Sequence, residues 1–154
     1  MRTYGPLLIR ASALVTARVF FEEQGARGFE GTALLAGTPS EGVTHCVIPE
    51  QRPYGNGEGI GVEVTETGKL ELASALTLDE LYLARIHSHP GEAFHSYVDN
   101  HNPGLTAEGS LSIVVPYYGL GLRRGLEVCA LFAYTQGHWT EVPATCIGEY
   151  AEVV

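Results

Sequence analysis

The order of apolar segments along the chain constrains its fold more than any other feature of the sequence. One segment, running from Ser12 to about Gln24, repeats apolar residues at the spacing of an α-helix. Most of the other apolar segments are short and β-like, and a polar segment with turn and helix signals interrupts them before residue 81. This order predicts an α/β (α+β) fold, in which a mixed β-sheet is accompanied by few helices.

The boundaries of the helix and the strands can also be predicted. Ser12 is expected to be the N-cap of the helix and Gly25 its left-handed C-cap. Leu14, Ala17 and Phe21 mark the inner face, with Ala13 and Phe20 beside them. Strands are predicted over residues 7–9, 30–37, 44–48, 62–64, 70–72, 81–86, 110–118, 127–134 and 138–147.

The polar segment before residue 81 is predicted to be mostly irregular. Residues 50–61 are rich in Gly, Pro and polar side chains and are expected to form a loop. Residues 65–69 are expected to be the turn of a hairpin that joins strands 62–64 and 70–72. Thr77 and Glu80 have the spacing of a capping box, which predicts a short helix there.

Composition favours a small soluble domain and argues against two classes of partner. The 154 residues fit a single domain over residues 1–154, and 45% of them are apolar. The net charge of −9 argues against nucleic-acid binding, because phosphate neutralisation requires lysine and arginine. No apolar run approaches the roughly 18 residues that cross a bilayer. The first apolar stretch is broken by Arg10 and is too short for a secretory signal, so a cytoplasmic location is expected.

The three cysteines, Cys46, Cys129 and Cys146, do not form a recognisable redox or disulfide pattern. Their number is odd, their spacing is wide and no C-x-x-C pair is present. Each lies in a β-like apolar segment, which predicts that they are buried as small hydrophobic side chains.

The segment from residue 87 to residue 99 carries the most chemistry. His87 and His89 are two apart on an extended segment, so their side chains point the same way and can converge on one ion. Pro90 ends the strand directly after them. Ser96 and Asp99 are three apart, so one helical turn places both on one face and can bring Asp99 back beside the histidines.

Two imidazoles and one carboxylate form a typical catalytic zinc site. Such a site has three protein ligands and leaves the fourth position to water, whose pKa the zinc lowers towards neutrality. A nearby carboxylate can then take the proton and pass it to a leaving amine. Ser96 can donate a hydrogen bond to the oxyanion that develops on a substrate carbonyl.

The residues alone leave other interpretations open. An H-x-H pair also occurs on strands for packing or by chance. His95 and His101 lie near the pair as rival ligands, although an exposed loop position is expected for both and for Glu92. His45 and His138 have no partner at ligand spacing, and structural roles are expected for them.

Four motif pieces in the same order resemble the JAMM (JAB, MPN-plus) zinc metalloproteases. They are E-x-x-A-L-L-A-G from Glu30, H-S-H-P from His87, A-F-x-S-x-x-D from Ala93 and S-I-V-V-P from Ser112. The resemblance covers roughly residues 7–135. The sequence is also similar to the prokaryotic JAB peptidases that are encoded beside bacterial ubiquitin-like conjugation systems.

The resemblance implies a site, a fold and a reaction. His87, His89 and Asp99 would bind one catalytic Zn²⁺, Glu30 would activate the bound water and Ser96 would stabilise the oxyanion. The fold would be a curved mixed sheet flanked by a long N-terminal helix and by a short helix after the H-x-H motif. The reaction would be hydrolysis of the amide bond after the C-terminal tail of a ubiquitin-like protein.

The sequence departs from the family at two positions. The segment between His89 and Ser96 is one residue shorter than the family usually has, which leaves the ligands in place and alters the loop after Pro90. Ala33, three residues after Glu30, stands where the family usually has glycine, which adds only a methyl group.

The same motifs admit two further functions. A JAMM hydrolase that releases an amino acid or peptide from a sulfur-carrier protein would share every motif. A non-catalytic MPN-type scaffold would bind partners without cleaving them, but such relatives usually lack the metal ligands. For the peptidase, residues 50–76 are the predicted wall of a groove in which the substrate tail adds a strand.

Overall fold

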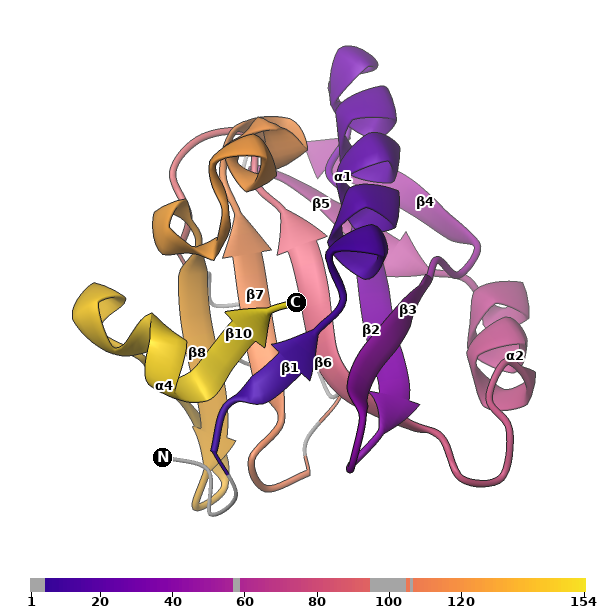
Figure 1. Ribbon diagram of the computed structural model, residues 1–154. Coiled ribbons are helices and arrows are strands. Elements are labelled where there is room, and N and C mark those ends of the chain that lie inside the picture. The colour runs from indigo at the N-terminus through magenta and orange to yellow at the C-terminus, as the bar shows by residue number, and fades with distance from the viewer. Residues whose placement is uncertain (1–4, 57–58, 95–104, 106) are drawn as a thin grey trace.

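The computed structural model describes residues 5–56, 59–94, 105 and 107–154, and Figure 1 shows their arrangement. The elements in chain order are β1 (Leu7–Ile9), α1 (Ala11–Ala26), β2 (Thr32–Thr38), β3 (Gly42–Val47), β4 (Gln51–Asn56), β5 (Gly59–Val64), α2 (Glu66–Ser74), β6 (Leu81–Ser88), β7 (Leu111–Val115), the 3₁₀-helices η1 (Tyr117–Arg124) and η2 (Leu126–Val128), β8 (Ala130–Thr135), β9 (His138–Glu141), the 3₁₀-helix η3 (Ala144–Cys146), α4 (Ile147–Tyr150) and β10 (Ala151–Val153).

Eight of the described strands form one mixed sheet, which confirms the predicted fold class. Their order is β10-β1-β3-β2-β6-β7-β8-β9, while β4 and β5 form a separate two-stranded antiparallel sheet. Strand β6 pairs antiparallel with β2 on one side and parallel with β7 on the other. The strand that ends in the histidines is therefore central in the sheet and is held from both sides.

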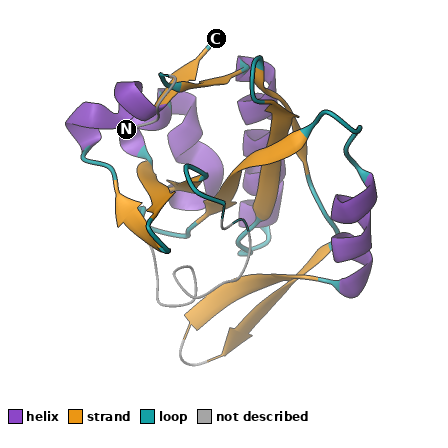
Figure 2. Ribbon diagram, turned by 90° about the horizontal axis from the view of Figure 1, so that it is seen from below, coloured by secondary structure: helices purple, strands orange, loops and turns teal. Residues whose placement is uncertain are grey.

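Helix α1 packs on one face of this sheet and forms the main core with it. Its buried residues are Ala13, Leu14, Ala17 and Phe21, which confirms the inner face predicted from the helical spacing. Inward-facing residues of the central strands, including Leu35, Ile86 and Ile113, join the same core. Figure 2 shows the β4–β5 hairpin on the opposite side of the sheet from α1.

Both predicted caps of α1 are wrong: contacts with distant segments determine where the helix begins, and bonds among residues 24–29 close its end. Arg10 occupies the N-cap position without a side-chain cap, and Ala11 instead donates its backbone N–H to Val154. Ser12 lies inside the helix. Gly25 also lies inside it, and the left-handed turn after the helix is made by Gly28, whose φ is +78°.

The predicted loop and hairpin over residues 50–72 are also wrong. Residues 50–61 contain β4 and the start of β5, and the hairpin turn predicted at 65–69 is the first turn of α2. Thr65 is the N-cap of α2 and accepts a hydrogen bond from the N–H of Gly68 at 3.0 Å. A glycine is present at position 68 because a Cβ there would lie 2.1 Å from the Glu50 carbonyl oxygen, so close packing rather than a turn explains it.

The other differences lie at the ends of elements. The side chain of Glu80 accepts hydrogen bonds from Thr77, as in a capping box, but no helix follows and Leu81 begins β6. The strand predicted over 138–147 ends at Glu141, and after Pro143 the chain forms η3, α4 and β10. Strand β10 pairs parallel with β1, a long-range contact that no local pattern reveals.

The three cysteines are partly or fully buried, as expected of small apolar side chains. Cys129 is buried, while Cys46 and Cys146 are half-buried, and all three are free thiols. Burial raises the pKa of the Cys46 and Cys129 thiols to about 12.

No helix in the described part of the chain has the length and apolar character needed to cross a bilayer.

The packing of α1 gives a test of the core. Phe21→Ala should lower the free energy of unfolding by about 3–5 kcal/mol, because Phe21 is fully buried between helix and sheet. Val19→Ala is the matched control on the same helix, because Val19 is 44% exposed, and it should change stability little. Chemical denaturation measures both, and equal effects would contradict the packing described above.

Candidate metal centre

His87 and His89 converge at the end of β6, as the H-x-H spacing predicts. Their Nε2 atoms lie 3.2 Å apart, and the ring centroids are 5.0 Å apart. Their exposed fractions are only 8% and 5%. Two nitrogens that bind one tetrahedral zinc at 2.0–2.1 Å are themselves about 3.3–3.4 Å apart. The imidazole pair therefore has the spacing and the donor chemistry of two zinc ligands.

The backbone of His89 is held by hydrogen bonds to the segment that follows β7. Its N–H donates to the Val115 carbonyl at 2.9 Å, and its own carbonyl accepts from the Tyr118 N–H at 2.7 Å. Further along, the Gly91 carbonyl accepts from the Tyr117 N–H at 2.9 Å. His89 lies just beyond the last residue of β6, so these bonds, rather than strand pairing, hold the segment from His89 to Gly91 in place.

Ser88, between the two histidines, joins this strand end to the segment that carries Glu30. It is fully buried, and its side chain points to the sheet face opposite the histidines. Its N–H donates to the Gly31 carbonyl at 2.9 Å, and its hydroxyl oxygen accepts from the Gly31 N–H at 2.9 Å. Ser88 thus satisfies both polar groups of Gly31.

Gly31 is required at this junction because the backbone approaches α1 closely. A Cβ at this position would lie 2.8 Å from the Phe21 ring and 2.9 Å from the Phe20 ring. Sequence reasoning did not identify Ser88 or Gly31 as parts of the site. The signal available for Ser88 was a hydroxyl between two ligand candidates, on the apolar face of a buried strand, where it needs a hydrogen-bond partner.

Glu30 lies directly before this junction and is half-buried. Thr32 is paired with His87 in the β2–β6 register, and the Ser88–Gly31 bonds continue that register by one residue. Extending it by one more residue brings Glu30 beside His89. On an extended chain Glu30 and Thr32 project to the same face, which is the face of the histidines. The structure therefore brings the predicted base to the histidine end of the strand.

Asp99 and Ser96 lie outside the described residues, so their predicted roles as ligand and oxyanion donor stay predictions. The same is true of the rival ligands His95 and His101 and of the short helix expected after the H-x-H motif. Among the described residues, no group of three or more His, Cys, Asp or Glu side chains is placed to hold a metal ion.

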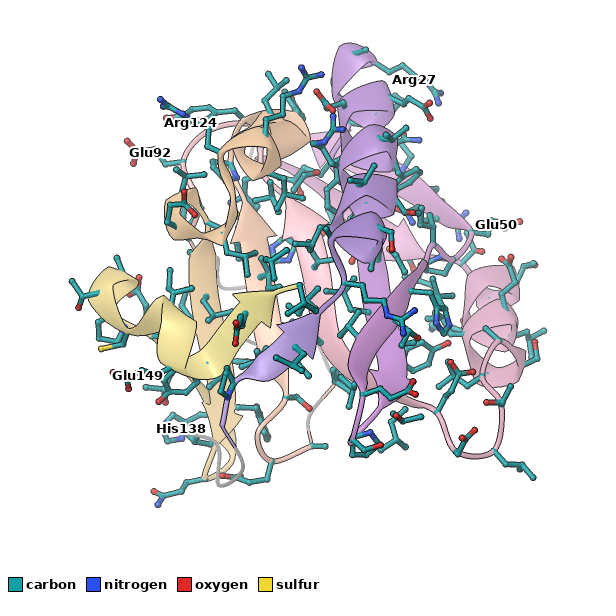
Figure 3. The ribbon with its side chains drawn as sticks, viewed as in Figure 1. Arg27, Glu50, Glu92, Arg124, His138 and Glu149 are labelled. Atoms are coloured by element: carbon teal, nitrogen blue, oxygen red, sulfur yellow. The ribbon has the colours of Figure 1, made fainter. Side chains whose placement is uncertain are left out.

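Three of the other candidate residues, Glu92, His45 and His138, lie in the described part of the chain. Glu92 is exposed in the loop after His89, and Figure 3 shows it at the opposite end of the sheet from His138. The Nδ1 atom of His138 lies 3.2 Å from the Gln136 carbonyl oxygen. The Nδ1 atom of His45 lies 3.0 Å from the Thr44 hydroxyl and 3.4 Å from Glu80. Both histidines make local structural contacts, as expected.

Two features border the imidazole pair. On the side of β2, the Gln51 side chain bonds both backbone groups of Thr32 at 2.9 Å and so anchors the start of the β4–β5 hairpin beside the Glu30 segment. On the other side, the Phe94 ring meets the His89 ring edge-on at 4.8 Å between centroids. The pair thus lies between the hairpin and an aromatic side chain.

A buried positive charge is also present on the histidine face of the sheet. Arg85 lies two residues before His87 and is 8% exposed. Its Nε donates to the Ser112 hydroxyl at 3.0 Å, and its guanidinium lies 4.3 Å from the centroid of the Trp139 ring. Arg85 has no role in the predictions made from the sequence.

The sequence is 33% identical over 143 residues to the probable metalloprotease y4jG of Sinorhizobium fredii, a match that covers 86% of this chain and 84% of that protein. No protein-family model matches the sequence. The chain thus shares most of its length with a protein named as a metalloprotease.

Two solved structures share the fold. One is the solution structure of protein DSY2949 from Desulfitobacterium hafniense, with a TM-score of 0.59 and 13% identity over 96% of this chain and 92% of that one. The other is the crystal structure of AF2198, a JAB1/MPN domain protein from Archaeoglobus fulgidus, with a TM-score of 0.51 and 17% identity over 97% of this chain and 98% of that one. At these identities the likeness concerns the fold alone.

The Ser88–Gly31 junction leads to a stability prediction. Ser88→Ala should lower the free energy of unfolding by about 1–3 kcal/mol, because the buried Gly31 N–H loses its acceptor. Ser12→Ala is the control, because the exposed Ser12 does not cap α1, and it should change stability by less than about 0.5 kcal/mol. Denaturant titration measures the loss in both variants. A larger loss for Ser12→Ala than for Ser88→Ala would indicate that Ser12 does cap α1 and would contradict the importance given to the Ser88–Gly31 bonds.

Proposed function

Because the chain belongs to the JAB/MPN metalloprotease-like family, we propose that it is a zinc-dependent isopeptidase that cleaves the amide bond after the C-terminal tail of a ubiquitin-like protein. The observation that carries this proposal is the buried imidazole pair, with Nε2 atoms 3.2 Å apart at the end of a central strand. The family resemblance of the motifs supplies the substrate class.

His87, His89 and Asp99 are the proposed zinc ligands. The two imidazoles have the spacing of tetrahedral zinc ligands, and a carboxylate completes the set of three that catalytic zinc sites use. When bound, the ion supplies the Lewis acidity that activates water towards an amide carbonyl.

Glu30 is the proposed general base and acid. Support for this role comes from the β2–β6 register, whose last printed pair, Thr32 with His87, lies two residues from Glu30 and would set Glu30 beside His89 if it continued. A carboxylate that stays outside the ligand set can accept a proton from the attacking water and deliver it to the leaving amine. Ser96 is the proposed hydrogen-bond donor to the oxyanion.

The β4–β5 hairpin is the proposed wall of the substrate groove. It lies on the histidine side of the sheet, and Gln51 anchors its first residue beside the Glu30 segment. An extended substrate tail can add to such a hairpin as a further strand, with main-chain hydrogen bonds giving affinity. A narrow groove beside the metal centre would favour a tail that ends in small residues, such as Gly-Gly.

The first test concerns the base. Glu30→Ala should lower kcat by about a hundred- to ten-thousandfold, because proton transfer loses its carboxylate, while zinc content stays normal. The assay incubates the zinc-loaded protein with ubiquitin-like proteins that carry C-terminal extensions, with and without chelator. Glu92→Gln is the control, because this exposed carboxylate lies near the site without an assigned role. Near-normal turnover by Glu30→Ala would disprove the base assignment.

The same assay separates the alternative functions. A protein that releases an amino acid or peptide from a sulfur-carrier conjugate, and not from a lysine conjugate, belongs to the sulfur-carrier class. A protein that binds such partners without zinc and without cleavage is a scaffold.

The second test concerns the ligands. His89→Ala and Asp99→Ala should each lose the zinc that elemental analysis finds in the parent protein, because two ligands hold the ion far more weakly than three. His95→Ala and His101→Ala should retain it, since they are the rival ligands of the same segment. Loss of zinc from a rival variant, with retention in Asp99→Ala, would reassign the third ligand.

A further inference from the structure

Tyr118 contacts both segments that carry the proposed catalytic machinery. We infer that it is a positioning residue that holds the Glu30 segment in a fixed relation to His89, an inference that rests on the proposed function. Its backbone bonds the histidine segment and its side chain packs against the turn that precedes Glu30.

The backbone part of this arrangement depends on an unusual conformation. Tyr117 and Tyr118 have φ angles of +56° and +53°, in the left-handed region that residues other than glycine rarely adopt. In this conformation the Tyr117 N–H donates to the Gly91 carbonyl and the Tyr118 N–H donates to the His89 carbonyl. Both acceptors lie in the segment that follows β6. Since the His89 N–H is bonded to Val115, the last residue of β7, both backbone groups of His89 are held by the end of β7 and the turn that follows it.

The side-chain part reaches the other half of the site. The Tyr118 side chain lies against Gly25 in the last turns of α1, where a Cβ would come within 2.3 Å of the Tyr118 Cβ. Its hydroxyl donates a hydrogen bond of 3.4 Å to the Gly28 carbonyl, two residues before Glu30. The ring therefore supports the α1–β2 turn from which Glu30 extends.

Helix α1 keeps η1, and with it Tyr118, in place. Gly119 packs so closely on the helix that a Cβ there would lie 2.5 Å from the Cβ of Phe21. Arg123 donates to the Glu22 carboxylate at 2.8 Å from the far end of η1. A left-handed conformation persists at residues other than glycine when surrounding contacts determine it, and such positions cluster at functional sites.

The adjacent tyrosine offers a matched control. Tyr117 shares the left-handed backbone and also donates its N–H, to the Gly91 carbonyl, but the residue is 54% exposed. Replacing either tyrosine with glycine keeps the N–H and suits the positive φ. Only Tyr118→Gly removes a ring from beneath Gly25 and Gly28.

The first experiment measures amide hydrogen exchange in the zinc-loaded variants, which requires no activity. Tyr118→Gly should speed exchange in residues 28–32 and leave β6 residues 84–88 and the zinc affinity unchanged. Tyr117→Gly should leave all three unchanged. Unaltered exchange of residues 28–32 in Tyr118→Gly would overturn the inference, whatever the reaction of the protein is.

The second experiment measures turnover of the tail-extended substrate that the parent protein cleaves. Tyr118→Gly should lower kcat about tenfold to a hundredfold with KM unchanged, because a small displacement of a catalytic group has effects of this size. Tyr118→Phe should restore most of the rate, since the ring remains. In a Glu30→Gln background, Tyr118→Gly should have no further effect if it acts through Glu30; an additional loss of similar size would overturn that route.

A variant on the helix keeps the test independent of the stability of η1. Gly25→Ala favours helix formation in α1 but forces the added methyl into Tyr118. It should reproduce the faster exchange of residues 28–32 and the lower kcat without loss of helix content by circular dichroism. Parent-like exchange and kcat in Gly25→Ala would contradict the proposed contact. Should the parent protein cleave no tail-extended substrate, the proposed function fails, and should Glu30→Gln retain parent-like kcat, the assignment of Glu30 as the base fails. In both cases the exchange result still judges the Tyr118 contact.

Discussion

The pair of hydrogen bonds between Ser88 and Gly31 is the interaction on which the candidate centre depends. It closes the β2–β6 ladder at the end where the histidines emerge, and it determines how far Glu30 lies from them along the sheet. Because side chains alternate on a strand, the residue that makes this contact points into the core while its neighbours on both sides point to the other face. The H-S-H sequence thus serves packing and chemistry at once.

Close packing against α1 limits which residues can occupy the Ser88–Gly31 junction. Gly31 lies against the Phe20 and Phe21 rings, and Gly25 lies against Tyr118, so α1 touches the site segments at two places where no side chain fits. Two left-handed tyrosines together cost roughly 2–4 kcal/mol relative to ordinary backbone. The contacts of η1 with α1 must offset that cost. The long helix consequently does more than cover the sheet, since it also holds the two segments of the proposed centre.

The face opposite α1 carries the residues on which the proposed site depends. It carries the imidazole pair and the buried Arg85, and the β4–β5 hairpin lies on the same side. Gln51 links that hairpin to the first residue of β2, so the proposed groove wall and the proposed base are attached to the same strand. A substrate bound along the hairpin would therefore approach a carboxylate and two imidazoles whose relative positions are set by one sheet.

Local periodicity in the sequence determined the inner face of α1, the central strands and the convergence of His87 and His89, because helical and strand alternation place side chains without reference to the rest of the chain. Composition could not select Glu30 among 18 acidic residues, and only the motif resemblance did. Tertiary structure decided the rest. The start of α1, the pairing of β1 with β10, the role of Ser88 and the turn at Tyr118 all depend on backbone contacts between segments distant in sequence, which leave no local pattern.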